Sequence, residues 1–199
     1  MVYVFPNPSG LPDVGSSCTG FSGLGTFVFE RGDDDEPVQY YTGAWMNGVF
    51  HGVGMYVDTF ADVRYFGEWQ FGKSQGSGEF RCAGLLLNGS FSNGCLEGEG
   101  CAVFANGDIL YGFFEAGLPR KGIYEFKDGS RYSGTFVNWE FDGEGEYKSF
   151  DGRVTYEGKF ANGEFEGQGE LLTRDPDPDF LDGLPKRYKG AFSKGVPHG

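Results

Sequence analysis

The chain has 199 residues, of which 36 are glycine and 18% are aromatic. This is not the composition of an ordinary globular core, since glycine packs nothing and rings carry most of the burial. The formal charge of −13 argues against a nucleic-acid partner and, less strongly, against an anionic membrane surface, because both bind basic residues.

Residues 1–40 are predicted to form an N-terminal cap with a degenerate half repeat. The alternation of one repeat strand is present there in Gly23, Gly25, Phe27 and Phe29. Val2 to Phe5 is a candidate for an extra strand. The opening residues have neither a basic region nor a long apolar stretch, so we expect no signal peptide, no transmembrane helix and a cytoplasmic location.

Residues 41–172 are interpreted as six copies of one repeat. Each copy opens with Tyr-x-Gly-x-aromatic, or with Leu in place of Tyr. The copies, with a partial seventh at residues 188–199, start at Tyr41, Tyr65, Leu87, Leu110, Tyr132, Tyr156 and Tyr188. A turn glycine and a Gly-x-Gly phrase follow in most copies. Both phrases have a period of two, which predicts two short strands joined by the glycine turn into an antiparallel hairpin.

The spacing also predicts how the two strands of a hairpin pair. If Trp45 faces Gly52, then Gly43 faces Gly54 and Tyr41 faces Tyr56, because antiparallel partners keep a constant index sum. The same arithmetic pairs Trp69 with Gly76 and Phe136 with Gly143. Each large ring would then lie over a strand position without a side chain.

The predicted fold is all-β: an elongated single-sheet solenoid of antiparallel β-hairpins in a twisted, open meander. One hairpin is marginal in water, so the hairpins must stabilise one another by stacking. An acidic loop with prolines, residues 173–187, interrupts the series before the last, partial repeat.

Alternation along the strands predicts an aromatic face rich in glycine and a polar, increasingly acidic face. The aromatic face is either buried within the solenoid or is a groove for an amphipathic helix or peptide of a partner protein. The residues predicted to bind such a partner are Tyr41, Trp45, Tyr65, Trp69, Phe91, Phe114, Tyr132 and Phe136.

The phrases YTGAWMNGVFHGVGMY and YEGKFANGEFEGQGEL resemble the MORN (membrane occupation and recognition nexus) repeat, whose usual pattern is YxGxWxxGxxxGxG. The resemblance runs from Tyr41 to Gly199. It implies a non-catalytic scaffold for protein–protein interaction or assembly in the cytoskeleton, with a cilium, a flagellar axoneme or a cortical structure as the setting. Departures from the pattern include Trp139, which replaces the turn glycine of the fifth copy.

No residues form a convincing catalytic, cofactor or metal site in the sequence. His51 and His198 occupy the same repeat slot without a neighbouring nucleophile. The carboxylates recur at equivalent repeat positions, which favours a solvated face over a glycosidase pair or a calcium site. The four cysteines lack C-x-x-C spacing and are expected to remain thiols: Cys18, Cys82, Cys95 and Cys101.

Two other functions remain open. The C-terminal cations Lys186, Arg187, Lys189 and Lys194 would suit contact with phosphoinositide or another anionic lipid. The unfinished last repeat would suit a homodimer formed through an open end of the sheet.

Overall fold

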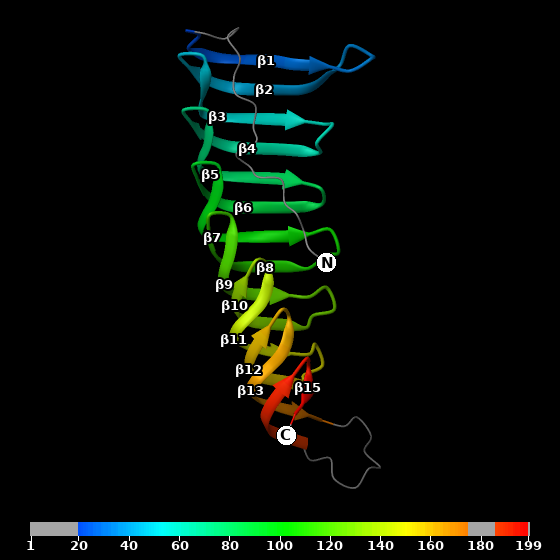
Figure 1. Cartoon of the computed structure of the whole chain (residues 1–199). Coiled ribbons are helices and arrows are strands. Elements are labelled where there is room, and N and C mark those ends of the chain that lie inside the picture. Colours follow the sequence, from blue (N-terminus) through cyan, green and yellow to red (C-terminus); the bar gives the residue numbers. More distant parts are fainter. Residues whose placement is uncertain (1–19, 175–185, 199) are drawn as a thin grey trace. The chain divides into compact units, whose positions relative to one another are not determined.

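The computed structural model describes residues 20–174 and 186–198, which form fifteen strands and no helix (Figure 1). The chain divides into two compact units: unit 1 comprises residues 1–104 and 115–117, and unit 2 comprises residues 105–114 and 118–199. Val2 to Phe5 and most of the inserted loop lie outside the described residues.

Unit 1 is an antiparallel meander whose strands pair in chain order. Its strands are β1 (Gly23–Arg31), β2 (Pro37–Met46), β3 (Val49–Asp58), β4 (Val63–Gln70), β5 (Lys73–Cys82), β6 (Leu85–Ser92) and β7 (Cys95–Phe104). The residues in which the degenerate half repeat was predicted, Gly23 to Phe29, lie in β1, which pairs with β2.

Unit 2 continues the same plan. Its strands are β8 (Ile109–Glu115), β9 (Leu118–Glu125), β10 (Arg131–Val137), β11 (Glu140–Lys148), β12 (Val154–Ala161), β13 (Glu164–Thr173), β14 (Lys186–Ser193) and β15 (Val196–Pro197). The last residue of β8, Glu115, belongs to unit 1. From β9 to β15 each strand is antiparallel to the next. The predicted all-β, open meander of hairpins is therefore confirmed.

Two-residue turns close the hairpins because both turn residues adopt left-handed backbone angles. Asn47 and Gly48 have φ of 52° and 81°, as a type I′ turn requires, and Met46 pairs with Val49 around them. Trp139 takes the glycine position of the fifth copy with φ of 70°, so a bulky residue adopts the angle that glycine usually supplies.

One part of the predicted register is wrong. Tyr41 pairs with Tyr56 and Gly43 with Gly54 as expected, but Trp45 pairs with Phe50 and not with Gly52. The register shifts between Gly43 and Trp45, where β3 has two more residues than β2. This β-bulge includes Gly52 in the left-handed region, with φ of 59°.

The bulge recurs in other hairpins and changes which strand each ring faces. Trp69 pairs with Ser74 rather than Gly76, and Phe136 pairs with Phe141 rather than Gly143. Gly52 instead pairs with Trp69 of the following hairpin. A ring therefore does face a glycine, but the contact joins successive hairpins rather than the two strands of one hairpin.

A glycine occupies the same register position on the strands β1 to β7 and again on β9 to β14, and we call this row the glycine ladder. In unit 1 it consists of Gly25, Gly43, Gly54, Gly67, Gly78, Gly89 and Gly100. In unit 2 its paired members are Gly122, Gly134, Gly145, Gly158, Gly169 and Gly190. A Cβ added at Gly145 would lie 2.6 Å from Cε2 of Tyr132, which shows that the ring occupies the space of the missing side chain.

Candidate functional site

The aromatic side of the hairpins, which we call the inner face, is closed. All eight rings predicted to bind a partner are at most 4% exposed: Tyr41, Trp45, Tyr65, Trp69, Phe91, Phe114, Tyr132 and Phe136. Within each unit these rings are packing residues, and partner binding by them stays a prediction.

Stacked ring pairs fill the inner face of three hairpins. Tyr41 stacks on Phe50 with centroids 3.9 Å apart and planes 12° apart. The equivalent pairs in unit 2 are Tyr132 with Phe141 at 3.9 Å and Tyr156 with Phe165 at 3.8 Å. The sequence analysis did not identify Phe50 and its equivalents, although their recurrence two residues after the turn was a usable signal.

The polar atoms of these rings bind backbone carbonyls. The Tyr132 hydroxyl donates to the Thr135 carbonyl at 2.8 Å, and the same bond three residues on recurs at other repeat tyrosines. The Trp69 Nε1–H donates to the Gly54 carbonyl of the preceding hairpin at 3.1 Å. Burial raises the pKa of Tyr132 to about 12, so the neutral phenol is the form that the interior holds.

Turn amides link each hairpin to the one before it. Gly72 N–H donates to the Phe50 carbonyl at 3.0 Å, and the bond recurs from Gly94 to Ser74 and from Gly163 to Phe141. These bonds and the tryptophan contacts join successive hairpins, which accounts for the stability of strands that would be marginal alone.

Two of the recurrent carboxylates are structural. Glu97 accepts a bond from the Ala116 backbone N–H at 2.9 Å, and Glu166 accepts one from the Lys194 backbone N–H at 3.1 Å. Each ties one hairpin to the turn of the next. No group of three or more His, Cys, Asp and Glu is placed to hold a metal ion within residues 20–174 and 186–198.

Asp108, a nearly buried carboxylate in the link before β8, was not among the predicted site residues. It accepts bonds from the Tyr124 hydroxyl at 2.6 Å and from the Lys127 backbone N–H at 2.8 Å. Its partners hold the link in place, so its role is structural. A buried Asp in a repeat link gave no sequence signal that separated it from exposed link residues.

The remaining candidates show no reactive arrangement. His51 lies beside the Phe71 ring, with centroids 6.1 Å apart, next to the bulge glycine of β3. Cys82, Cys95 and Cys101 are free thiols, and burial raises the pKa of Cys82 and Cys101. Cys18 lies outside the described residues.

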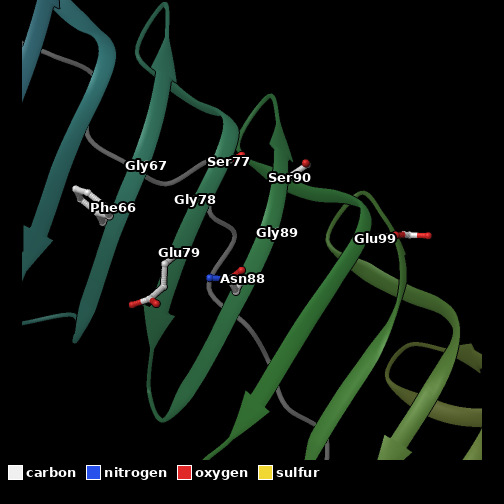
Figure 2. Close-up of a pocket in the computed structure, with 9 residues that line it drawn as sticks. All are labelled: Phe66, Gly67, Ser77, Gly78, Glu79, Asn88, Gly89, Ser90 and Glu99. Carbon is white, nitrogen blue, oxygen red and sulfur yellow. The ribbon is translucent and has the colours of Figure 1, made fainter.

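The opposite side of each unit carries the residues that flank the glycine ladder, and we call these residues the outer strip. In unit 1 they are Leu24, Thr26, Thr42, Ala44, Val53, Met55, Phe66, Glu68, Ser77, Glu79, Asn88, Ser90, Glu99 and Cys101. A groove of about 510 Å³ crosses this strip over β4 to β7, with the ladder glycines as its floor (Figure 2). The outer strip of unit 1 is thus an accessible concave surface.

The outer strip of unit 2 carries paired charges. Glu144 lies opposite Lys159 and Glu170 opposite Lys189 across neighbouring strands. Beside it, the Arg187 guanidinium lies 2.7 Å from the Glu170 carboxylate and holds the pKa of Glu170 below its usual value.

The four cations predicted to touch anionic lipid are all exposed, but acidic groups are close to them. Arg187 is paired with Glu170, and Lys189 lies opposite the same carboxylate. Lys194 lies in the turn that Glu166 holds through a backbone bond. Of the four cationic side chains, Arg187 is thus the one that the structure shows paired with a carboxylate.

None of the described residues forms a helix long and apolar enough to cross a membrane. The family model of the MORN repeat matches five segments of the chain: residues 41–59, 65–84, 88–109, 156–175 and 188–199. It does not match the hairpins between residues 110 and 155, yet the Tyr132 ring there has the stacking and the hydroxyl bond of the matched repeats.

Proposed function

The chain belongs to the MORN-repeat family, and from this premise we propose that it is a non-catalytic scaffold that holds other proteins in a cytoskeletal assembly. MORN repeats are binding or scaffold modules. The finer assignment, a cytoplasmic protein of a cilium, a flagellar axoneme or a cortical structure, is supported by the resemblance of the repeats to those of cytoskeletal proteins.

One observation carries the proposal: the hairpins pack their rings against one another and over the glycine backbone, which leaves a regular outer surface free. The inner rings are closed, and the carboxylates Glu97 and Glu166 tie hairpins together. A fold built in this way provides binding surface along its repeats, which is what a scaffold requires.

Proximity labelling in the source cell would test the proposal. The full chain fused to a labelling enzyme should enrich cytoskeletal or ciliary proteins over the enzyme alone, and a fluorescent fusion should concentrate in the same structure. A diffuse fusion that enriches no protein above the control would contradict a scaffold role.

Contact with anionic lipid is a second candidate, because the four exposed cations of β14 and the following turn lie close together in the sequence. Cosedimentation with phosphoinositide liposomes, compared between the wild type and a variant with all four cations changed to glutamine, would test it. Equal sedimentation of the two proteins would eliminate this function.

Self-association is a third candidate, since β1 and β15 stand at the ends of the strand order. Light scattering over a range of protein concentrations would detect a dimer. A monomer mass at every concentration would eliminate it.

A further inference from the structure

The outer strip of unit 1 exposes apolar side chains that its own hairpins leave uncovered. Leu24 is 83% exposed, and Val53 and Phe66 are each 56% exposed. Met55 lies directly opposite Phe66 on the neighbouring strand, and Ala44 lies opposite Leu24. Directly opposed residues have Cβ atoms about 5 Å apart, so these residues form two apolar pairs, one on β1 and β2 and one on β3 and β4. Together with Val53 they make up the apolar patch of this strip.

The same strip is acidic. It contains Glu68, Glu79 and Glu99 but no Lys or Arg. Glu79 has an exposed ion pair with Arg81 at 2.8 Å, and Glu68 accepts a backbone bond from Ser77. Glu99 has no ion-pair partner among residues 20–174 and 186–198.

The charge of the surrounding unit has the same sign. The described part of unit 1 has four Lys and Arg against twelve Asp and Glu, whereas that of unit 2 has twelve of each. Unit 1 therefore produces a net negative potential around its apolar patch, which attracts a basic partner and repels a second copy of unit 1 or an anionic lipid surface.

The groove supplies the shape. Gly67, Gly78 and Gly89 form its floor, Phe66 lies at one side, and Glu99 lies at the other (Figure 2). Ser77 and Ser90 are small, so side chains of a partner could enter between the apolar patch and the carboxylates.

We propose that the outer strip of unit 1 binds a basic amphipathic peptide segment of a partner protein. Apolar side chains of the segment pack on Phe66 and Val53, and its Lys or Arg side chains pair with Glu79 and Glu99. This inference rests on the proposed scaffold function and specifies the surface and the chemistry of one partner.

A synthetic amphipathic helix made only of Leu and Lys is a suitable probe, measured by fluorescence anisotropy against the full chain. We expect Phe66→Ser to weaken binding about tenfold and Glu99→Lys several-fold, because central apolar contacts carry most of the affinity at such surfaces. Added salt should weaken binding by the wild type.

Matched changes in unit 2 serve as controls. Phe150 is 69% exposed, and Glu157 belongs to the outer strip of that unit. Phe150→Ser and Glu157→Lys should leave the affinity unchanged. A scrambled Leu/Lys peptide and an amphipathic Leu/Glu peptide should bind at least tenfold more weakly than the probe.

Hydrogen exchange locates the bound peptide, with protection expected over β3 to β6 and not over β11 to β13. Unchanged circular dichroism and melting of Phe66→Ser would show that the variant folds. Equal affinity of Phe66→Ser and the wild type, equal binding of the Leu/Glu peptide, or protection confined to unit 2 would overturn the inference. If labelled partners bind the Phe66→Ser variant as well as the wild type, the scaffold function stands and this surface assignment fails.

Discussion

Units 1 and 2 share an interior but differ on the outside. Both place rings over a glycine ladder and close hairpins with left-handed turns. On the outer strip, however, unit 1 has three carboxylates and no Lys or Arg, whereas unit 2 sets Glu144 opposite Lys159 and Glu170 opposite Lys189. Exposed apolar side chains occur in both units, Val53 and Phe66 in unit 1 and Tyr111 and Phe113 in unit 2. The shared features build the fold, and the differing strip is where the two units can have separate binding roles.

The interiors also show how much variation the fold accepts. In the third repeat, Leu87 and Leu96 are both buried and take the places that Tyr132 and Phe141 occupy in the fifth. Apolar volume is therefore the requirement at these positions, and an aromatic stack is one way to meet it.

Alkaline pH should have the largest effect and should show that the two interiors are alike. Burial raises the pKa of Tyr56 in unit 1 and of Tyr132 in unit 2 to about 12, from an ordinary value of 10.0. Because the unfolded state loses these protons first, the stability that these two tyrosines contribute should be fully present below about pH 10 and be lost as the pH rises toward 12. Circular dichroism and tyrosinate absorbance would follow the transition, and hydrogen exchange would report each unit. Unfolding of one unit well below pH 10 would show that the two interiors are not alike.

Adding a methyl group to the glycine ladder should destabilise an aromatic repeat more than the aliphatic third repeat. A Cβ at Gly145 meets the Tyr132 ring at 2.6 Å, whereas a Cβ at Gly100 meets the Asn88 carbonyl oxygen and Leu96 Cδ2, each at 3.1 Å. We expect Gly145→Ala to cost about 3 kcal/mol and Gly100→Ala about 1 kcal/mol, because overpacking is costlier where the neighbour is a rigid ring. Urea unfolding of both variants would measure the difference, and equal costs would contradict this account of the ladder.

Removal of one hydroxyl should have a smaller effect. Tyr132→Phe keeps the ring on Phe141 but removes the bond to the Thr135 carbonyl. A loss of about 1 kcal/mol is expected, since a buried carbonyl is left without this donor. Thermal unfolding would measure it, with Tyr156→Phe as the equivalent change in the next repeat. No loss in either variant would show that the hydroxyl bonds are dispensable.

The smallest effect is expected at the ion pair beside the outer strip of unit 2. Arg187→Gln removes the exposed ion pair with Glu170 and should change stability by about 0.5 kcal/mol or less. Urea unfolding at low and high salt would check this value. A large loss of stability would mean that these charges support the fold. Units 1 and 2 would then differ in what stabilises them as well as in their surfaces.

Much of the interior could be predicted from the sequence. The alternation around Tyr41 and Gly43 predicts strands on one face, and the pairs Tyr41–Tyr56 and Gly43–Gly54 are as expected. The predicted pairing of Trp45 with Gly52 is wrong because the index sum of paired residues is constant only where neither strand has extra residues, and β3 has a bulge at this point. Phe50 was not predicted: its recurrence two residues after the turn marks the position, but the bulged pairing of the hairpin brings it onto the Tyr41 ring.

By itself the sequence determined the repeat, the all-β class and the family, because each depends on residues a fixed distance apart. Only the tertiary structure decided which face is available. The bulged strands bring Trp69 onto the Gly54 carbonyl of the preceding hairpin, so the rings become interior. Phe66 and Val53, which the alternation places among polar residues, remain exposed because the hairpins cover the other face.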